Sequence, residues 1–449
     1  MQLQALTHKG YPAWAPPLAA TAVGKQGWNI HQPDWPMPCA VLRQGPLVHN
    51  LGWLQRLVSA AGAQLAPHGK TTLSPELMQA QLNAGAWGIT FANVAQLALG
   101  VAHGVRCAIL ANQVWLPHDL NWLLQLQSQH PDLRAPFLLD SHAQLDALEA
   151  VWRQHAAGTT RRFDVLLELG LEGGRTGCRD DAHALALAER IANSPATQLV
   201  GVECYEGLWA QGDDAADRNL VDGLMARVQT VLKACDRADA FQRTDAILIT
   251  AGGSAVFDLV LAWLGKLSTP TGQASNLTKP VVGVLRSGCY ITHDHGAYQR
   301  LVHQVTHRLS ALPPGHPMGH AATGVCGSGL QAALEVWCSV QSLPEPGLAI
   351  LNAGKRDLSH DWGLPVPLAV VPAGTRQTHG LPAQARITRL NDQHAYLEWD
   401  TNSHPVTPLA VGDQVGLGIS HPCTTFDRWR WMPVVDDHGG IVDAITTGF

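Results

Sequence analysis

The sequence predicts an α/β fold, a (β/α)8 barrel followed by an all-β domain, from three observations. Residues 48–290 alternate short apolar runs with amphipathic stretches, and the apolar runs are eight in number. This stretch has about the 250 residues that a (β/α)8 barrel typically needs. After about residue 301, the helical periodicity gives way to short segments broken by Gly and Pro, which is typical of an all-β domain.

The eight predicted strands are short apolar runs of the kind that form buried strands. They are residues 64–66, 87–91, 107–110, 137–139, 165–169, 199–204, 247–250 and 281–285. Between them, apolar residues recur at i, i+3 and i+4, which predicts helices that pack on a sheet. Eight alternating units favour a closed barrel. A doubly wound open sheet has the same periodicity and is the structural alternative.

We therefore expect three segments. Residues 41–300 form the barrel, and residues 301–449 form the β domain. Residues 1–40 are rich in Pro and Trp and contain no long periodic helix, so we expect them to pack with the β domain.

Composition excludes several classes of protein. The net charge is −6 with no basic cluster, which argues against a general nucleic-acid binder. There is no run of 18 uncharged apolar residues and no hydrophobic signal core, so we expect a cytoplasmic protein without a membrane partner. The nine cysteines are scattered and contain no CxxC, which argues against a disulfide framework.

Lys70 is the main candidate for a reactive amine. Active-site residues of (β/α)8 barrels follow the C-terminal ends of the strands. Of the seven lysines, only Lys70 follows a predicted strand within a Gly-containing turn. An amine there would form a Schiff base or transfer a proton, whereas the simpler alternative is a solvent-exposed loop lysine.

The loop Gly252-Gly253-Ser254 follows the seventh predicted strand and precedes a helix. Glycines let the backbone approach an anion, and a helix start offers unpaired N–H groups. Tight β-to-α turns use glycine anyway, so the loop alone is a weak signal. Together with Lys70 it favours pyridoxal phosphate, which needs an amine for its aldehyde and an anchor for its phosphate.

His421 and Cys423 are the best candidate metal ligands, and they lie in the β domain. Side chains two residues apart on an extended segment point the same way, so an imidazole and a thiolate would reach one Zn²⁺. A His-x-Cys pair alone is a poor motif. His293-Asp294-His295 is the alternative pair, with a hydrogen-bonded loop near the barrel rim as its simpler interpretation. His360-Asp361 is interpreted as structural or as a partner of a ligand.

The chain resembles the D-serine dehydratase and D-threonine aldolase family, which are alanine-racemase-type (fold type III) pyridoxal phosphate enzymes. The resemblance spans roughly residues 66–423, with the motifs in the same order. These motifs are Pro67-His68-Gly69-Lys70-Thr71, Ala111-Asn112-Gln113, Arg175-Thr176-Gly177, Tyr205-Glu206-Gly207, Gly252-Gly253-Ser254, Arg286-Ser287-Gly288-Cys289-Tyr290, Asn352-Ala353-Gly354-Lys355 and His421-Pro422-Cys423. The resemblance implies a homodimer in which the β domain faces the barrel mouth.

The resemblance also implies roles for single residues. Lys70 would bind the cofactor aldehyde as an imine, Arg175 would lie near its phenolic oxygen, and Tyr205 would lie near its pyridine nitrogen. The residues that would hold the phosphate are Gly252, Gly253, Ser254 and Tyr290. In this family His-x-Cys is found in zinc-dependent dehydratases, whereas aldolases tend to carry His-x-Asp. Cys423 therefore favours zinc and the dehydratase, because thiolate selects softer metals.

The resemblance predicts a lyase that converts D-serine or D-threonine to a 2-oxo acid and ammonia. Lys70 would remove the α-proton, and zinc on His421 and Cys423 would assist loss of the β-hydroxyl. The alternative is a metal-dependent D-threonine aldolase that yields glycine and an aldehyde. A non-catalytic pyridoxal phosphate carrier is disfavoured, because such single-barrel proteins lack a second domain. A phosphate-binding barrel enzyme unrelated to pyridoxal, with Lys70 as a general base, is a further alternative.

Overall fold

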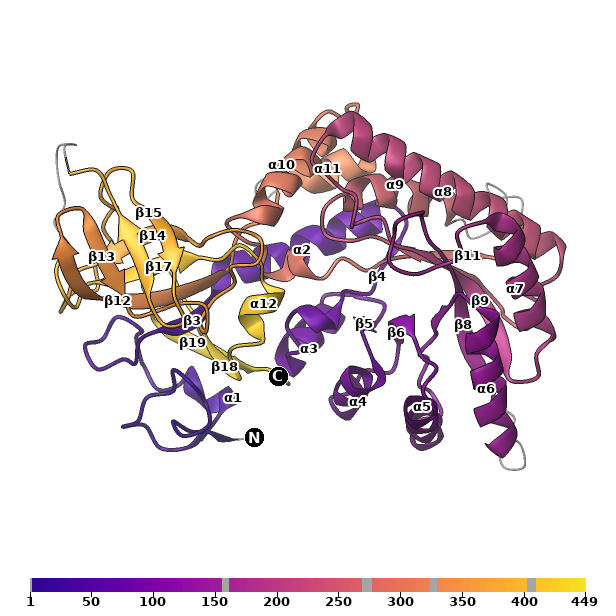
Figure 1. The fold of residues 1–449 in the computed structure, drawn as a ribbon, viewed down its shortest axis with the longest axis horizontal. Helices are drawn as coiled ribbons and strands as arrows, with labels where there is room; N and C mark the ends of the chain where they lie inside the picture. The colour runs from indigo at the N-terminus through magenta and orange to yellow at the C-terminus, as the bar shows by residue number, and fades with distance from the viewer. Residues whose placement is uncertain (1, 156–160, 269–276, 324–328, 402–408) are drawn as a thin grey trace.

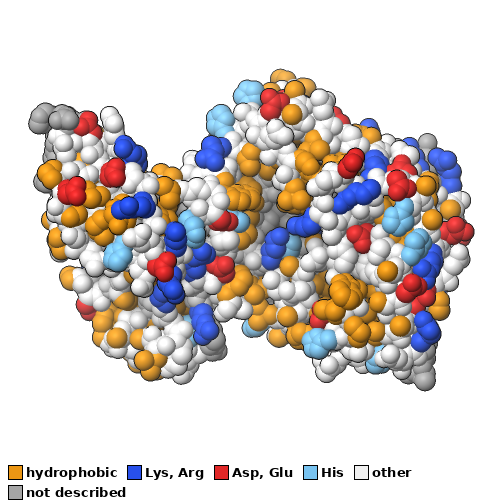
Figure 2. All heavy atoms as spheres, in the orientation of Figure 1, with side chains coloured by type: hydrophobic (Ala, Val, Ile, Leu, Met, Phe, Trp, Pro, Cys, Tyr) orange, Lys and Arg blue, Asp and Glu red, His pale blue; other side chains and the backbone are white. Residues whose placement is uncertain are grey.

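The structure is a computed structural model and describes residues 2–155, 161–268, 277–323, 329–401 and 409–449. It has two parts, a ring of parallel strands surrounded by helices and a β-rich domain beside it (Figure 1). The space-filling view shows a hollow between the two parts, with Lys or Arg side chains lying in it (Figure 2).

All eight predicted strands of the barrel are present, in the order β4-β11-β10-β9-β8-β7-β6-β5, with parallel pairing. They are β4 (Gln64–Leu65), β5 (Ile89–Phe91), β6 (Ala108–Gln113), β7 (Phe137–Leu139), β8 (Phe163–Leu169), β9 (Thr197–Cys204), β10 (Ile247–Ala251) and β11 (Val281–Leu285). β4 and β5, the first and last strands of this order, are joined by two hydrogen bonds. Trp87 N donates to Leu65 O at 2.7 Å, and Thr90 N donates to Pro67 O at 2.9 Å. The sheet therefore closes, and the predicted (β/α)8 barrel is confirmed.

The predicted helices surround the barrel and bury one face each. They are α3 (Pro75–Asn83), α4 (Val94–Ala102), α5 (Pro117–Gln129), α6 (His142–His155), α7 (Asp181–Asn193), α8 (Asp214–Arg237) and α9 (Phe257–Leu267). A further helix, α2 (Gln44–Ala60), precedes the first predicted strand and was not among the predicted helices. In α8, for example, Val221, Leu224, Val228 and Leu232 are buried at helical spacing. Because every connection returns the chain to the same end, the C-terminal ends of all eight strands share one rim.

The predicted β domain is confirmed, although one of its strands comes from before the barrel. The strands are β12 (Leu334–Glu345), β13 (Leu348–Leu351), β14 (Val366–Val371), β15 (Arg386–Leu390), β16 (Ala395–Glu398), β17 (Gln414–Gly418), β18 (Trp431–Val435) and β19 (Ile441–Thr446). β3 (Cys39–Arg43) lies between β12 and β18 in this sheet. The barrel is thus inserted between two neighbouring strands of the β domain, which ties the two parts together at both ends.

The N-terminal residues pack on the β domain. They include β1 (Gln2–Leu3), β2 (Leu18–Ala19) and α1 (Ala20–Val23). Tyr11, Trp28 and Trp35 form one buried cluster with Trp337 and Trp431 of the β domain. The Tyr11 and Trp431 rings meet edge to face with centroids 5.2 Å apart, so Tyr11, Trp28 and Trp35 act as core residues.

Helical structure continues beyond the predicted boundary at residue 301. That position falls inside α10 (Ala297–Ser310), which is followed by α11 (Pro317–Thr323), and these helices pack against α9 and α2. Arg308 of α10 forms a buried ion pair with Asp258 of α9, with Nε 2.6 Å from Oδ2. The helical part therefore extends to Thr323. The spacing of Val302, Val305 and Leu309, all buried, was a helical signal within the sequence.

Among the described residues, no helix is long and apolar enough to cross a membrane. The eight cysteines in the described ranges are all free thiols, and Cys326 lies outside those ranges.

Candidate active site

Lys70 lies at the barrel mouth in the short 3-10 turn η1 (Gly69–Thr71) after β4. The neighbouring strand fixes the entry to this turn, because His68 N donates to Arg286 O at 3.1 Å. Gly69 is required, since a Cβ there would lie 2.9 Å from a side-chain carbon of Ile89. The Lys70 side chain itself is exposed, so its amine is open to a ligand.

Positive charges gather around Lys70. The pKa of His68 is held well below its usual value, first by burial and then by the charges of Lys70, Arg286 and Arg175. His68 is therefore neutral, and three cationic side chains lie near it. This arrangement suits a ligand that carries negative charge.

Arg286 and Glu203 each have one buried polar atom without a partner among the described residues. Arg286 forms a buried ion pair with Glu203 of β9 and donates to Cys204 O at 3.0 Å. Its Nη1 and the Glu203 Oε2 are nevertheless unpaired. Burial raises the pKa of Glu203 to about 8, against the effect of Arg286. Unsatisfied buried polar atoms are rare, and they fit a site built for a polar group.

The loop Gly252-Gly253-Ser254 follows β10, as predicted, but its first two amides already have an acceptor. Gly252 N donates to Glu206 Oε2 at 3.2 Å, and Gly253 N donates to Oε1 at 2.7 Å. Glu206 is only 1% exposed. Glycine is required at position 252, where φ is +102°. Glu206 was not a predicted site residue, and it sets the shape of the loop.

Ser254 provides a hydroxyl beside this loop. Its Oγ accepts hydrogen bonds from Cys289 N at 3.3 Å and from Ser287 Oγ at 3.4 Å, which leaves its own proton to donate. Tyr290, in η2 (Cys289–Ile291), is buried, and its hydroxyl accepts from Gln81 Nε2 at 3.3 Å. Burial raises the pKa of Tyr290.

Arg175 and Tyr205 lie together, with the guanidinium carbon 5.3 Å from the ring centroid. Burial raises the pKa of Tyr205 to about 12. Two carboxylates at strand ends hold the turn that carries Arg175. Thr176 Oγ1 donates to Glu168 Oε1 at 2.6 Å, and Gly177 N donates to Asp140 Oδ2 at 2.8 Å.

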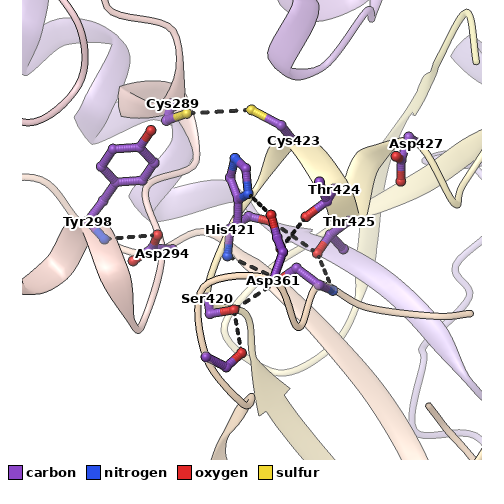
Figure 3. A network of polar contacts seen from close by, with 12 residues as sticks. Cys289, Asp294, Tyr298, Asp361, Ser420, His421, Cys423, Thr424, Thr425 and Asp427 are labelled. Atoms are coloured by element: carbon purple, nitrogen blue, oxygen red, sulfur yellow. Dashed lines mark hydrogen bonds and ion pairs between the residues drawn. The ribbon is translucent and has the colours of Figure 1, made fainter. Parts of the chain in front are cut away.

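His421 is oriented by a carboxylate, as Figure 3 shows. Its Nδ1 lies 2.6 Å from Asp361 Oδ2, which leaves Nε2 for another partner. The Trp362 ring stacks on the imidazole, with centroids 4.5 Å apart and planes 13° apart. Asp361 is thus the partner of a candidate ligand, one of the two interpretations made from the sequence.

Cys423 reaches the turn that carries Lys70. It begins the short helix α12 (Cys423–Phe426), and its Sγ donates to Thr71 Oγ1 at 3.5 Å. Pro422 has helical angles, φ −60° and ψ −46°, so the segment is not extended as the sequence argument assumed. The β domain, not the local strand geometry, brings the thiol to the barrel mouth of the same chain.

Cys289 is a residue that the sequence argument missed, because it was named only within a motif of the resemblance and was given no role. Its Sγ lies 3.7 Å from Cys423 Sγ (Figure 3). The contact with Cys423 lowers the pKa of Cys289 to about 6, and the same contact raises the pKa of Cys423. In the described ranges, no three His, Cys, Asp or Glu side chains are close enough to hold a metal ion as they stand.

The alternative pair, His293 and His295, belongs to a structural loop. Asp294 between them accepts hydrogen bonds from Gly296 N at 2.9 Å and from Tyr298 N at 3.1 Å, which caps α10. Burial lowers the pKa of both histidines to about 4.

Two family models match the chain. Residues 43–257 match the alanine racemase N-terminal domain, and residues 333–435 match the putative serine dehydratase domain. The two matches correspond to most of the barrel and most of the β domain.

Curated relatives are similar at low identity. D-threonine aldolase of Arthrobacter sp. is 25% identical over 408 residues, which cover 91% of this chain and 90% of the relative. D-threo-3-hydroxyaspartate dehydratase of Delftia sp. (strain HT23) is 28% identical over 258 residues, which cover 57% of this chain and 61% of the relative.

Solved structures share the fold. D-threonine aldolase from Filomicrobium marinum has a TM-score of 0.69 at 22% identity, covering 92% of this chain and 95% of that one. D-threo-3-hydroxyaspartate dehydratase from Delftia sp. HT23 has a TM-score of 0.65 at 20% identity, covering 92% and 97%.

Proposed function

We propose that this chain, a member of the D-serine dehydratase and D-threonine aldolase family of fold type III pyridoxal phosphate enzymes, is a D-3-hydroxyamino acid dehydratase. It would remove water from D-serine or D-threonine and release a 2-oxo acid and ammonia. The observation that carries the proposal is the thiol of Cys423 beside Thr71, one residue from Lys70. A thiolate at this position favours zinc over harder cations.

The residues at the mouth fit pyridoxal phosphate. An exposed amine, two nearby guanidinium groups and the hydroxyl of Ser254 offer partners for an aldehyde, a phenolic oxygen and a phosphate. The unpaired Nη1 of Arg286 is a further observation in favour of a polar group here. When bound, the cofactor would supply a ring that delocalises negative charge from the substrate Cα.

The predicted cofactor residues keep their proposed roles with one change. Lys70 would bind the aldehyde, and Arg175 would lie near the phenolic oxygen. Tyr205, which packs against Arg175, would lie near the pyridine nitrogen. The proposed phosphate residues are Gly252, Gly253, Ser254 and Tyr290. Because Glu206 occupies the amides of both glycines, we assign hydroxyl donation to Ser254 and the shape of the loop to Glu206.

Lys70 Nζ would act as the base that takes the proton from the substrate Cα. His421 and Cys423 would hold Zn²⁺, which would supply a Lewis acid for the β-hydroxyl oxygen. Asp361 would fix the orientation of His421, as carboxylates do beside metal-bound histidines.

Product identification tests the proposal. Purified enzyme loaded with pyridoxal phosphate and zinc is incubated with D-threonine, D-serine or D-threo-3-hydroxyaspartate, the last because a relative bears its name. We expect 2-oxobutyrate and ammonia from D-threonine. Glycine and acetaldehyde would establish the aldolase, which the relative spanning 91% of this chain favours. Failure of borohydride to trap the cofactor on Lys70 would reject the cofactor assignment.

A further inference from the structure

We infer that Cys289 is an additional protein ligand of the metal at His421 and Cys423, so that the site is Cys2His. This inference rests on the proposed function, because it concerns the metal proposed there. Cys289 and Cys423 lie 134 residues apart in the sequence, and their sulfur atoms are 3.7 Å apart.

The distance between the sulfur atoms fits two thiolates on one zinc ion. With Zn–S bonds of about 2.3 Å and tetrahedral angles, two sulfur ligands lie about 3.8 Å apart. A disulfide requires about 2.05 Å, so these two sulfurs are not bonded to each other. Both thiols are therefore in position to bind one metal ion. Neither η2, which carries Cys289, nor α12, which carries Cys423, needs to move.

The groups around the two sulfurs support the same interpretation. Thr71 Oγ1 lies 3.5 Å from Cys423 Sγ and 3.8 Å from Cys289 Sγ, and Tyr298 forms a hydrogen bond with the Cys289 thiol. Ligand atoms of metal sites are usually held by such outer hydrogen bonds. Cys289 is only 6% exposed, so its thiol is shielded from bulk solvent.

The third ligand, His421, needs a small adjustment, because no three such groups in the described ranges are yet close enough to hold a metal. Its Nδ1 is held by Asp361, and Figure 3 shows its other ring nitrogen directed toward the two sulfurs. Metal binding would draw this ring inward. Catalytic zinc sites commonly use three protein ligands, Cys2His among them, and leave the fourth position for water or substrate.

The test counts sulfur ligands instead of measuring turnover. Zinc K-edge X-ray absorption is recorded on zinc-loaded holoenzyme kept under reductant, for the wild type, Cys289→Ser, Cys423→Ser and a control, Cys107→Ser. Cys107 precedes β6 at the opposite end of the barrel. We expect two sulfur neighbours at about 2.3 Å in the wild type and the control, and one in each of the other variants.

Zinc affinity gives a second readout, with a chromophoric chelator as competitor. Cys289→Ser should weaken zinc binding at least about tenfold while the pyridoxal absorbance is unchanged, which shows that the variant folds. An unchanged sulfur count in Cys289→Ser, or a Cys289–Cys423 disulfide in the reduced enzyme by mass spectrometry, overturns the inference.

The outcomes separate this inference from the proposed function. If the wild type has one sulfur ligand and still yields 2-oxobutyrate in a zinc-dependent way, only the role of Cys289 is rejected. If the sulfur count is two and the products are glycine and acetaldehyde, the ligand assignment holds and the dehydratase is rejected.

Discussion

Asp361 and His421 are 60 residues apart in the sequence and form a side-chain contact, with Oδ2 2.6 Å from Nδ1. A carboxylate in this position fixes the tautomer and the ring orientation, and it makes the other nitrogen a better donor to a metal. Asp361 also accepts from Thr424 Oγ1 at 2.8 Å, so the carboxylate is itself held in place.

Asp361→Ala should therefore weaken zinc binding by about 10–100-fold without changing the pyridoxal absorbance. Asp361→Asn keeps an acceptor and loses the charge, so its effect should be intermediate. Competition with a chromophoric chelator measures the affinity. The control is Asp427→Ala, since this exposed carboxylate pairs with Arg428 rather than with His421. Equal affinities for Asp361→Ala and the control would contradict a positioning role.

Lys70→Ala should lower turnover of the D-amino acid by about 10²–10⁴-fold, because the variant lacks the base at Cα. It should also lose borohydride-stable labelling by the cofactor, which peptide mass spectrometry detects. Lys266→Ala is the matched control, since Lys266 lies on α9 over the Trp263 ring, 4.5 Å from its centroid. Labelling of Lys70→Ala at another lysine with retained turnover would reject the assignment.

Glu206→Ala should weaken pyridoxal phosphate binding and lower the free energy of unfolding. The substitution leaves the amides of Gly252 and Gly253 buried without an acceptor, and each unpaired donor costs about 1–3 kcal/mol. Urea unfolding and cofactor titration measure the two effects. Glu189→Ala, at an exposed position on α7, should change neither quantity. Unchanged cofactor affinity in Glu206→Ala would show that the loop keeps its shape without the carboxylate.

Stability should fall on acidification because of His293. Burial lowers the pKa of this side chain from 6.5 to about 4, and the residue is 4% exposed. The unfolded chain binds a proton near pH 6.5 that the folded protein takes up only near pH 4. The contribution of His293 to the free energy of unfolding is therefore complete above pH 6.5. It decreases as the pH falls, and the free energy of unfolding is lower by about 3 kcal/mol at pH 4.

Urea unfolding of the wild type and His293→Asn between pH 7 and pH 4 checks this expectation. Asn tolerates the left-handed backbone at this position, where φ is +48°. The variant should lose part of the pH dependence, whereas the control His118→Asn, on the exposed surface of α5, should keep all of it. If the free energy of unfolding changes with pH by the same amount in His293→Asn and in the wild type, another group causes the acid sensitivity.

The elements of the barrel were predictable because their signals lie within a few residues along the chain. A buried strand such as β7 is a continuous apolar run, and a helix such as α8 repeats apolar residues at its own period. Lys70 was predictable for a similar reason, because a strand end and a Gly-containing turn are adjacent in sequence. The boundary at residue 301 was misplaced because α10 follows the last strand in the same periodic pattern and packs on α9.

The sequence by itself predicted the alternating strands and helices, the β domain and the amine at the rim, since hydrophobic periodicity and short motifs depend on neighbouring residues alone. The pairing of Cys289 with Cys423, the capture of two glycine amides by Glu206 and the contact of Asp361 with His421 required the folded chain. Each joins residues from different strand ends or domains. Closure of the barrel and the placement of β3 in the β-domain sheet set their distances, and no local pattern encodes a distance across the barrel mouth.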